Sequence, residues 1–174
     1  YASITYDMRP FFLMLAYSGS RIDQLYSVLK MSKEEKRKRV EEIRPDAENG
    51  LSRPVFRLMV KDLGSGKKNM ERLYFPPAMK DLALSYSPGF SLDTYSDQAT
   101  PAHLNKKRSK GKITPKTLRK WNTNRFLQDL KEPGEVAGWI EGRIPNKKTS
   151  AAAITWKNYT DLDALAAVAY AKAE

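Results

Sequence analysis

Cysteine is absent from the sequence, and histidine occurs once among its 174 residues. Without cysteine the chain has no disulfide bonds, no thiolate metal sites and no cysteine nucleophile. A single histidine argues against zinc sites and against histidine-based catalytic triads. We therefore expect a protein that works without a metal ion and without a cofactor.

Long apolar runs are also missing. No stretch approaches the run of about 20 apolar residues that crosses a bilayer, and no secretory signal opens the chain. We expect no membrane insertion and a cytoplasmic location. The length suits one domain over residues 1–174. The sequence begins at Tyr1 rather than at an initiator methionine, so we expect it to be the C-terminal fragment of a longer protein.

Acidic residues are outnumbered by basic ones, and the formal net charge is +11. Such an excess indicates an anionic partner, and nucleic acid and a membrane surface are the two main classes. The basic residues are spread over predicted loops and a hairpin rather than along one amphipathic helix, which disfavours the membrane surface. A basic surface that binds nothing is the remaining alternative.

The first third of the chain has the apolar spacing of helices. We predict helices over 11–19, 21–30 and 33–43, the first ending at Gly19. Ser20 with Asp23, and Ser32 with Glu35, have the spacing of capping boxes for the second and third helices. The third helix is polar on nearly every face, so we expect it on the surface.

Strand formers follow Pro54. Residues 55–60 and 71–75 predict a β-hairpin with a glycine-containing tip. Further helices are predicted over 78–84, 116–130, 135–142 and 161–174. Residues 91–104 are a weaker helical segment, and the basic run 105–112 is predicted to be a loop. Thr114 and Pro115 resemble an N-cap and a first helical residue. The predicted class is mainly α with a small antiparallel hairpin or sheet, that is, α+β.

Basic side chains occur at four places where a fixed backbone could direct them. Arg21 follows Gly19 and Ser20 at a helix start, and Lys116 and Arg119 share a helix face, where they repel each other unless an anion lies between them. The other two places are Lys67 and Lys68 at the hairpin tip and Arg143 after a helix end. Tyr159, just before the last predicted helix, is a further candidate. The basic run supplies candidate DNA-binding residues: Lys106, Lys107, Arg108, Lys110 and Lys112.

Each of these residues also has an ordinary structural interpretation. Arg21 could pair with Asp23, hairpin-tip lysines are often only solvated, and Lys116 and Arg119 could form an exposed face beside the apolar Leu118 and Trp121. Tyr159 could be an aromatic residue at the edge of the core. The functional interpretation therefore depends on the order and spacing of the whole set.

That ordered set resembles the catalytic domain of the tyrosine recombinases, most closely the integrases of archaeal viruses and plasmids. The matching segments are "AYSGSRIDQL", "ITPKTLRKW", "WIEGRIP" and "NYTDL", together with a lysine on a β-hairpin. The similarity covers nearly the whole chain, from about Met8 to its end. It implies a recombinase catalytic-domain fold and a site-specific recombinase that integrates a mobile genome into host DNA.

The resemblance also assigns roles to individual residues. It implies that Arg21, Arg119 and Arg143 hold the scissile DNA phosphate, and that Tyr159 attacks it to form a 3′-phosphotyrosine. Lys116 stands where relatives often carry histidine and would help the phenol to ionise. Lys67 would be the general acid, with Lys68 and Lys61 as alternatives. Four protomers would assemble on double-stranded DNA, although the chain could be monomeric in solution. The alanine-rich tail would be a candidate for packing against a neighbouring protomer.

Three features depart from the family pattern. Gln24 stands where many relatives have an acidic residue, and Arg143 and Tyr159 are 159 − 143 = 16 positions apart, more than about one helix length. His103 has no family counterpart and is expected on the surface. Two alternatives stay open: a type IB topoisomerase-like enzyme with the same chemistry in a monomer, and a basic DNA-binding module without catalysis.

Overall fold

The computed structural model describes residues 6–48, 50–63, 70–99, 115–142 and 159–173, with side chains for all of these except 96–99, 115 and 159–161. The α-helices are α1 (Arg9–Ser18), α2 (Ile22–Leu29), α3 (Lys33–Arg39), α4 (Lys80–Ser85), α5 (Leu92–Ala99), α7 (Pro115–Asn124), α8 (Gly134–Ile140) and α10 (Tyr159–Lys172). The strands are β1 (Val40–Ile43), β2 (Val55–Met59) and β3 (Arg72–Phe75). Short 3-10 turns lie at Tyr6–Met8, Lys61–Leu63 and Pro77–Met79, and a π-helical segment at Arg125–Asp129 follows α7.

The protein is mainly helical with one three-stranded antiparallel sheet, which confirms the predicted α+β class. The predicted hairpin is the β2–β3 pair, in which Leu58 faces Leu73. The third strand, β1, corrects the prediction of a helix over 33–43. Helix α3 ends at Arg39, where the chain becomes extended and pairs with β2, and Glu41 forms an ion pair of 2.7 Å with its cross-strand partner Arg57.

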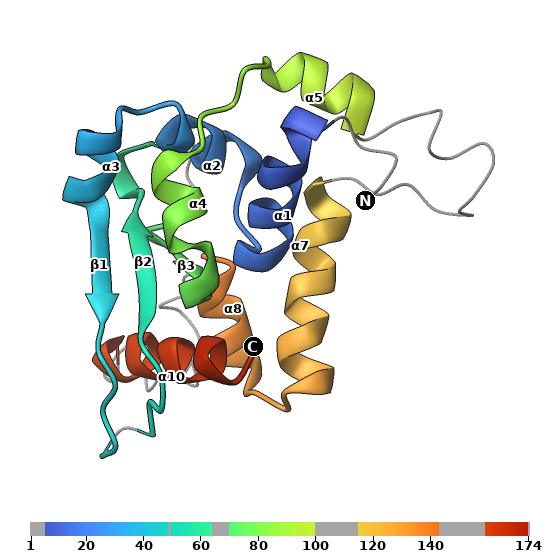
Figure 1. Cartoon of the computed structure of the whole chain (residues 1–174). Coiled ribbons are helices and arrows are strands. Elements are labelled where there is room, and N and C mark those ends of the chain that lie inside the picture. The colour runs from blue at the N-terminus through green and yellow to red at the C-terminus, as the bar shows by residue number, and fades with distance from the viewer. Residues whose placement is uncertain (1–5, 49, 64–69, 100–114, 143–158, 174) are drawn as a thin grey trace.

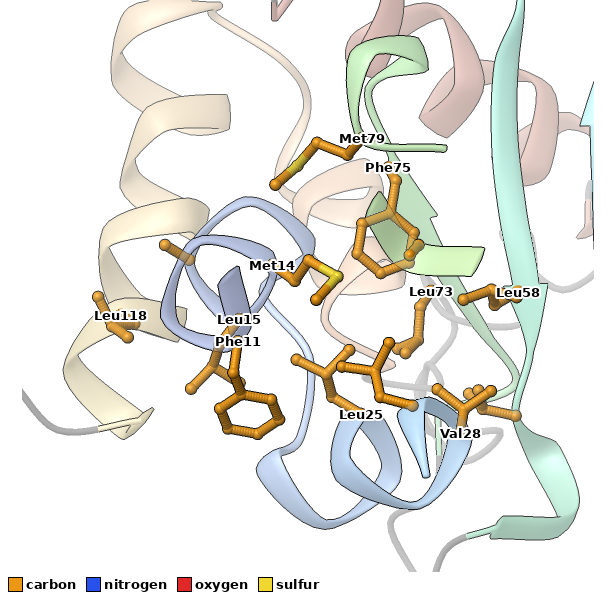
Figure 2. Close-up of a cluster of buried hydrophobic side chains, with 14 of the residues drawn as sticks. Phe11, Met14, Leu15, Leu25, Val28, Leu58, Leu73, Phe75, Met79 and Leu118 are labelled. Carbon is orange, nitrogen blue, oxygen red and sulfur yellow. The ribbon is translucent and has the colours of Figure 1, made fainter. Parts of the chain in front are cut away.

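Side chains on β3 alternate between two hydrophobic clusters, as the period of a strand requires. Leu73 and Phe75 face the cluster formed with α1 and α2, and Figure 2 shows them beside Leu25 and Met14. Tyr74 points to the opposite face, which α8 and α10 cover. In Figure 1, α10 (red) runs across the direction of the strands while α1, α2 and α4 lie on the other side. Strands β2 and β3 are therefore covered on both faces, whereas β1 is partly exposed.

The boundary of α2 differs from the prediction. The helix begins at Ile22 with Arg21 as N-cap, and Ser20 does not cap it. The hydroxyl of Ser20 instead accepts a hydrogen bond of 2.8 Å from Ser18. The capping box of Ser32 and Glu35 is confirmed. Helix α3 is less exposed than predicted, because Lys36 is buried and donates to the carbonyl oxygen of Tyr86 at 2.6 Å.

The later helices also shift at their ends. Helix α7 begins at Pro115 as predicted, but its last predicted turns are the π-helical segment Arg125–Asp129. Trp121 was expected near the buried side of this helix, but it is 47% exposed. Helix α10 starts at Tyr159, so this residue belongs to the last helix and does not precede it. No described helix is both long and apolar enough to span a bilayer.

The alanine-rich helix α10, a candidate for packing against a neighbouring protomer, packs here on the sheet and on α8 of its own chain. Its alanines and Tyr170 are buried in the cluster with α8, and the ring of Tyr170 stacks on Tyr74 with centroids 5.5 Å apart. Small side chains allow the helix to come close to the sheet. Leu165 is 44% exposed on the outer face.

Gly19 gives a direct test of how α1 ends. Its φ of 59° lies in the left-handed region, and an added Cβ would come within 2.6 Å of Asn122 Oδ1. We expect Gly19→Ala to lower the free energy of unfolding by at least about 1–2 kcal/mol, the cost of a left-handed alanine. Urea denaturation measures this effect. Gly89→Ala is the control, because a Cβ at Gly89 meets nothing within 4 Å, and equal midpoints for the two variants would contradict the prediction.

Candidate active site

The turn between α1 and α2 is fixed by the side chain of Asn122, which comes from α7. Asn122 is fully buried and donates hydrogen bonds to the carbonyl oxygens of Ala16 at 3.1 Å and Tyr17 at 2.7 Å. These carbonyls belong to the last turn of α1 and have no partner within the helix. The close approach of Asn122 to Gly19 completes the contact. Helix α7 is thereby held against the start of the "GSR" segment.

Arg21 and Arg119 come from the two elements that meet at this contact. Arg119 lies three residues before Asn122, so both project from neighbouring positions on one face of α7. Because Asn122 touches the α1–α2 turn, that face is directed toward Arg21. The Nε atom of Arg21 is buried and has no hydrogen-bond partner among the described residues, where Arg21 also forms no ion pair with Asp23.

Helix α8 ends against the same region. Arg119 donates from Nη2 to the carbonyl oxygen of Glu141, directly after α8. The next residue, Gly142, has a φ of 67°, and an added Cβ there would come within 2.4 Å of Met70 Cγ. Gly142 is the residue before Arg143 in the sequence, and Met70 is the first described residue after the hairpin tip. Gly142, just before Arg143, therefore lies against Met70, just after the hairpin tip, and the neighbouring Glu141 binds Arg119.

Gln24 ties α2 to both ends of the hairpin tip. Its amide nitrogen donates to the carbonyl oxygens of Val60 at 3.1 Å and Met70 at 3.0 Å, and its amide oxygen accepts from the Met70 N–H at 3.0 Å. A carboxylate at this position could accept from Met70 but could donate to neither carbonyl. The departure from the family pattern at Gln24 therefore has a structural role here.

The start of α10 is bound to the sheet and to α8 through Asp163. Its carboxylate accepts hydrogen bonds from Arg57, Arg72, Tyr74 and Trp139. Trp139 lies two residues before Glu141, whose carbonyl oxygen Arg119 binds. The start of α10, which carries Tyr159, is thus connected through α8 to Arg119.

The outcome for the predicted site residues is mixed. Arg21 and Arg119 come from adjoining elements, and Lys116 is exposed in the first turn of α7. Lys61 begins a 3-10 turn rather than ending a strand, and its exposed side chain lies 3.5 Å from Glu71. The residues outside the described ranges are Lys67, Lys68, His103, Lys106, Lys107, Arg108, Lys110, Lys112, Thr114 and Arg143, and for Tyr159 the structure describes only the helical backbone.

Four residues of this region were not predicted from the sequence: Gln24, Asn122, Trp139 and Asp163. Gln24 and Asn122 each stand in a helix at a buried position, and a polar residue among apolar ones at helical spacing was the available signal. Asp163 stands among alanines and has partners 24 to 106 residues away, so no local pattern reveals it.

Most of the described tyrosines are poorly suited to act as nucleophiles. Burial raises the pKa of Tyr74, Tyr95 and Tyr170, and it raises the pKa of Tyr86 to about 12. Each of these phenols therefore resists ionisation. Tyr170, the other tyrosine of α10, is fully buried and donates to the carbonyl oxygen of Tyr17 at 2.9 Å.

Within the described ranges, no three histidine or acidic side chains gather in a way that could hold a metal ion. Comparison of this chain with models of protein families, with curated proteins and with solved structures found no match. The functional assignment therefore rests on the residues and their geometry.

Gln24→Leu tests the link between α2 and the hairpin. The change leaves the carbonyl and the N–H of Met70 without their partner, while the Val60 carbonyl keeps its bond of 3.0 Å from the Leu63 N–H. Each buried group left unsatisfied costs about 1–3 kcal/mol. We expect a large loss of unfolding free energy and faster amide hydrogen exchange at Met70. Gln128→Leu is the matched control on an exposed position, where we expect a change within about 0.5 kcal/mol. Unchanged exchange at Met70 would count against this link.

Proposed function

We propose that the chain is the catalytic domain of a site-specific DNA recombinase of the tyrosine recombinase type. The observation that carries the proposal is the contact of α7, which carries Arg119, with the α1–α2 turn that leads into Arg21, whose Nε is buried and lacks an acceptor in the described residues. A buried N–H donor without an acceptor is costly, and a bound phosphodiester would supply both an acceptor and a charge opposite to that of the guanidinium.

The two arginines fit the electrostatic demand of attack at phosphorus. Negative charge grows on the non-bridging phosphate oxygens as the attacking oxygen approaches. A guanidinium offers a planar, permanently charged set of donors that can hold two such oxygens at once. Donors fixed in advance, as Arg119 is by its bond to Glu141, stabilise this charge without reorganising during the reaction. Arg143, which follows Gly142 in the sequence, would add a third donor.

Tyr159 would be the nucleophile. Its oxygen forms a bond to phosphorus, the bond from phosphorus to the 5′ oxygen breaks, and a 3′-phosphotyrosine results. The phenol gives up its proton, with Lys116 and the arginine charges favouring the phenolate. The leaving 5′ oxygen takes a proton from Lys67 or Lys68 of the hairpin. Attack by a 5′ hydroxyl on the phosphotyrosine reverses the step and joins strands, so the cycle needs no ATP.

The proposed partner is double-stranded DNA carrying a recombination site, on which four protomers would assemble inside the cell. The net charge of +11 supports an anionic partner of this kind. In this role the domain would integrate a mobile or viral genome into host DNA, as the resemblance to integrases of archaeal viruses and plasmids suggests.

Tyr159→Phe tests the chemistry. We expect the wild-type chain, incubated with a pool of nicked duplexes of randomised sequence, to form a covalent protein–DNA adduct on a denaturing gel. Tyr159→Phe loses the attacking oxygen, so its adduct should be absent. Tyr170→Phe is the matched control and should keep the adduct, because Tyr170 is buried and hydrogen-bonded inside the core.

Three other outcomes would replace the proposal. An adduct that persists in Tyr159→Phe would assign the nucleophile elsewhere. No adduct with any duplex, combined with binding that falls steeply with salt, would indicate a DNA-binding module without catalysis. Relaxation of supercoiled DNA by a monomer, without exchange between duplexes, would indicate a topoisomerase.

Arg21→Ala tests the phosphate-binding role. Removal of one preorganised donor in other enzymes lowers the rate about 10²–10³-fold, and we expect a loss of this size in the rate of adduct formation. Arg21→Lys should recover only part of it, because an ammonium cannot bind two oxygens as a guanidinium does. The control is Arg44→Ala, which removes the same charge from an exposed position. An equal loss of adduct-formation rate in both variants would mean that Arg21 contributes only to general DNA binding.

A further inference from the structure

Asp163 gathers more side-chain partners than its position in an alanine-rich helix would suggest. Trp139 donates to Oδ1 at 2.9 Å and Arg72 at 3.2 Å, and Tyr74 donates to the same oxygen. Arg57 binds Oδ2 at 2.9 Å. These partners come from β2, β3 and α8. The carboxylate therefore fixes one point of α10 against three separate elements.

Apart from Leu162 and Tyr170, the buried face of α10 consists mostly of small side chains. Four of its buried residues are Ala166, Ala167, Ala169 and Ala171. An alanine methyl group makes few contacts, and a row of them forms a smooth surface. Tyr170 anchors the C-terminal half through its stacked ring and its bond to Tyr17. In the N-terminal half, Asp163 makes all of the described side-chain hydrogen bonds.

Asp163 lies one helical turn after Tyr159. Four residues correspond to a rise of about 6 Å along the axis, so a shift of Asp163 moves the start of the helix with it. Trp139, which binds Asp163, is two residues before Glu141, whose carbonyl oxygen binds Arg119. The end of α8 therefore contacts both an arginine of the proposed phosphate site and the helix that carries the proposed nucleophile.

We propose that Asp163 is the positioning residue for the Tyr159 nucleophile, fixing the start of α10 relative to the arginines that hold the phosphate. This inference rests on the proposed function. Asp163 does not touch the reacting atoms. It acts through α10, and its effect is on the rate of the attack at phosphorus rather than on binding of DNA.

Asp163→Asn is the principal test. The variant keeps the volume and one carbonyl acceptor but removes the charge that binds Arg57 and Arg72. Small misplacement of reacting groups can cost about 10²-fold in rate. We expect the first-order rate of adduct formation, at saturating nicked duplex from the randomised pool, to fall about tenfold to a hundredfold while the dissociation constant for DNA is unchanged.

A matched control exists at the other end of the same helix. Lys172 Nζ binds Glu132 Oε1 at 2.8 Å, so Glu132→Gln loosens the C-terminal end of α10 without touching its start. We expect the rate of adduct formation by Glu132→Gln to equal that of the wild type. An equal fall in both variants would mean that general docking of α10 matters and would overturn the positioning role.

A sulfur-substituted substrate separates positioning from protonation of the leaving group. With sulfur in place of the bridging 5′ oxygen, the tyrosine oxygen still bonds phosphorus, the P–S bond breaks, and a thiolate leaves without a proton, since a thiol has a pKa near 8.5. If Asp163 positions the nucleophile, the Asp163→Asn defect keeps its size on this substrate. Recovery of the wild-type rate on this substrate would mean that Asp163 supports protonation of the leaving group, and this result would overturn the inference.

Circular dichroism and thermal melts accompany each assay, so that rates are compared only where the variants are folded. If Asp163→Asn does not fold, Tyr74→Phe carries the test, because it removes one hydrogen bond to Asp163 and keeps the ring stack with Tyr170. It should show the same pattern with a smaller fall in rate, and an unchanged rate in the folded variant refutes the inference. Absence of any adduct with the wild-type chain would refute the proposed function itself.

Discussion

The hydrogen bonds from Asn122 to the last carbonyls of α1 are the constraint on which the candidate site depends. They hold α7 against a turn that Gly19 makes possible by its left-handed backbone, and no larger residue fits beside the Asn122 side chain. Arg21 follows this turn, and Arg119 lies three residues before Asn122 on α7. A neutral amide thus holds together the two elements that carry these cations.

Buried polar side chains perform the same task around the rest of the region. Gln24 joins α2 to both ends of the hairpin tip, and Asp163 joins α10 to the sheet and to α8. Such networks rigidify a site, because in a low dielectric environment each lost bond is expensive. The backbone positions of the elements that carry the basic residues are in this way fixed by residues that carry no catalytic role.

Local sequence signals predicted much of the fold correctly. Gly19 as the end of α1, the capping box of Ser32 and Glu35, and the β2–β3 hairpin all follow from interactions within a few residues. The strand β1 was not predicted, since its sequence "VEEI" is half exposed and becomes a strand only by pairing with β2. The same holds for Lys36, whose burial depends on a carbonyl oxygen 50 residues away.

The sequence by itself determined the chemical inventory: no thiol, one imidazole, a large excess of cations, and an ordered set of arginines, lysines and a tyrosine. These follow from residue identity alone. Only the tertiary structure decided which of them adjoin one another, that Tyr170 is an interior residue, and that Gln24, Asn122 and Asp163 hold the elements together. The physical reason is that these contacts join segments from 24 to more than 100 residues apart, and no local propensity encodes such a pairing.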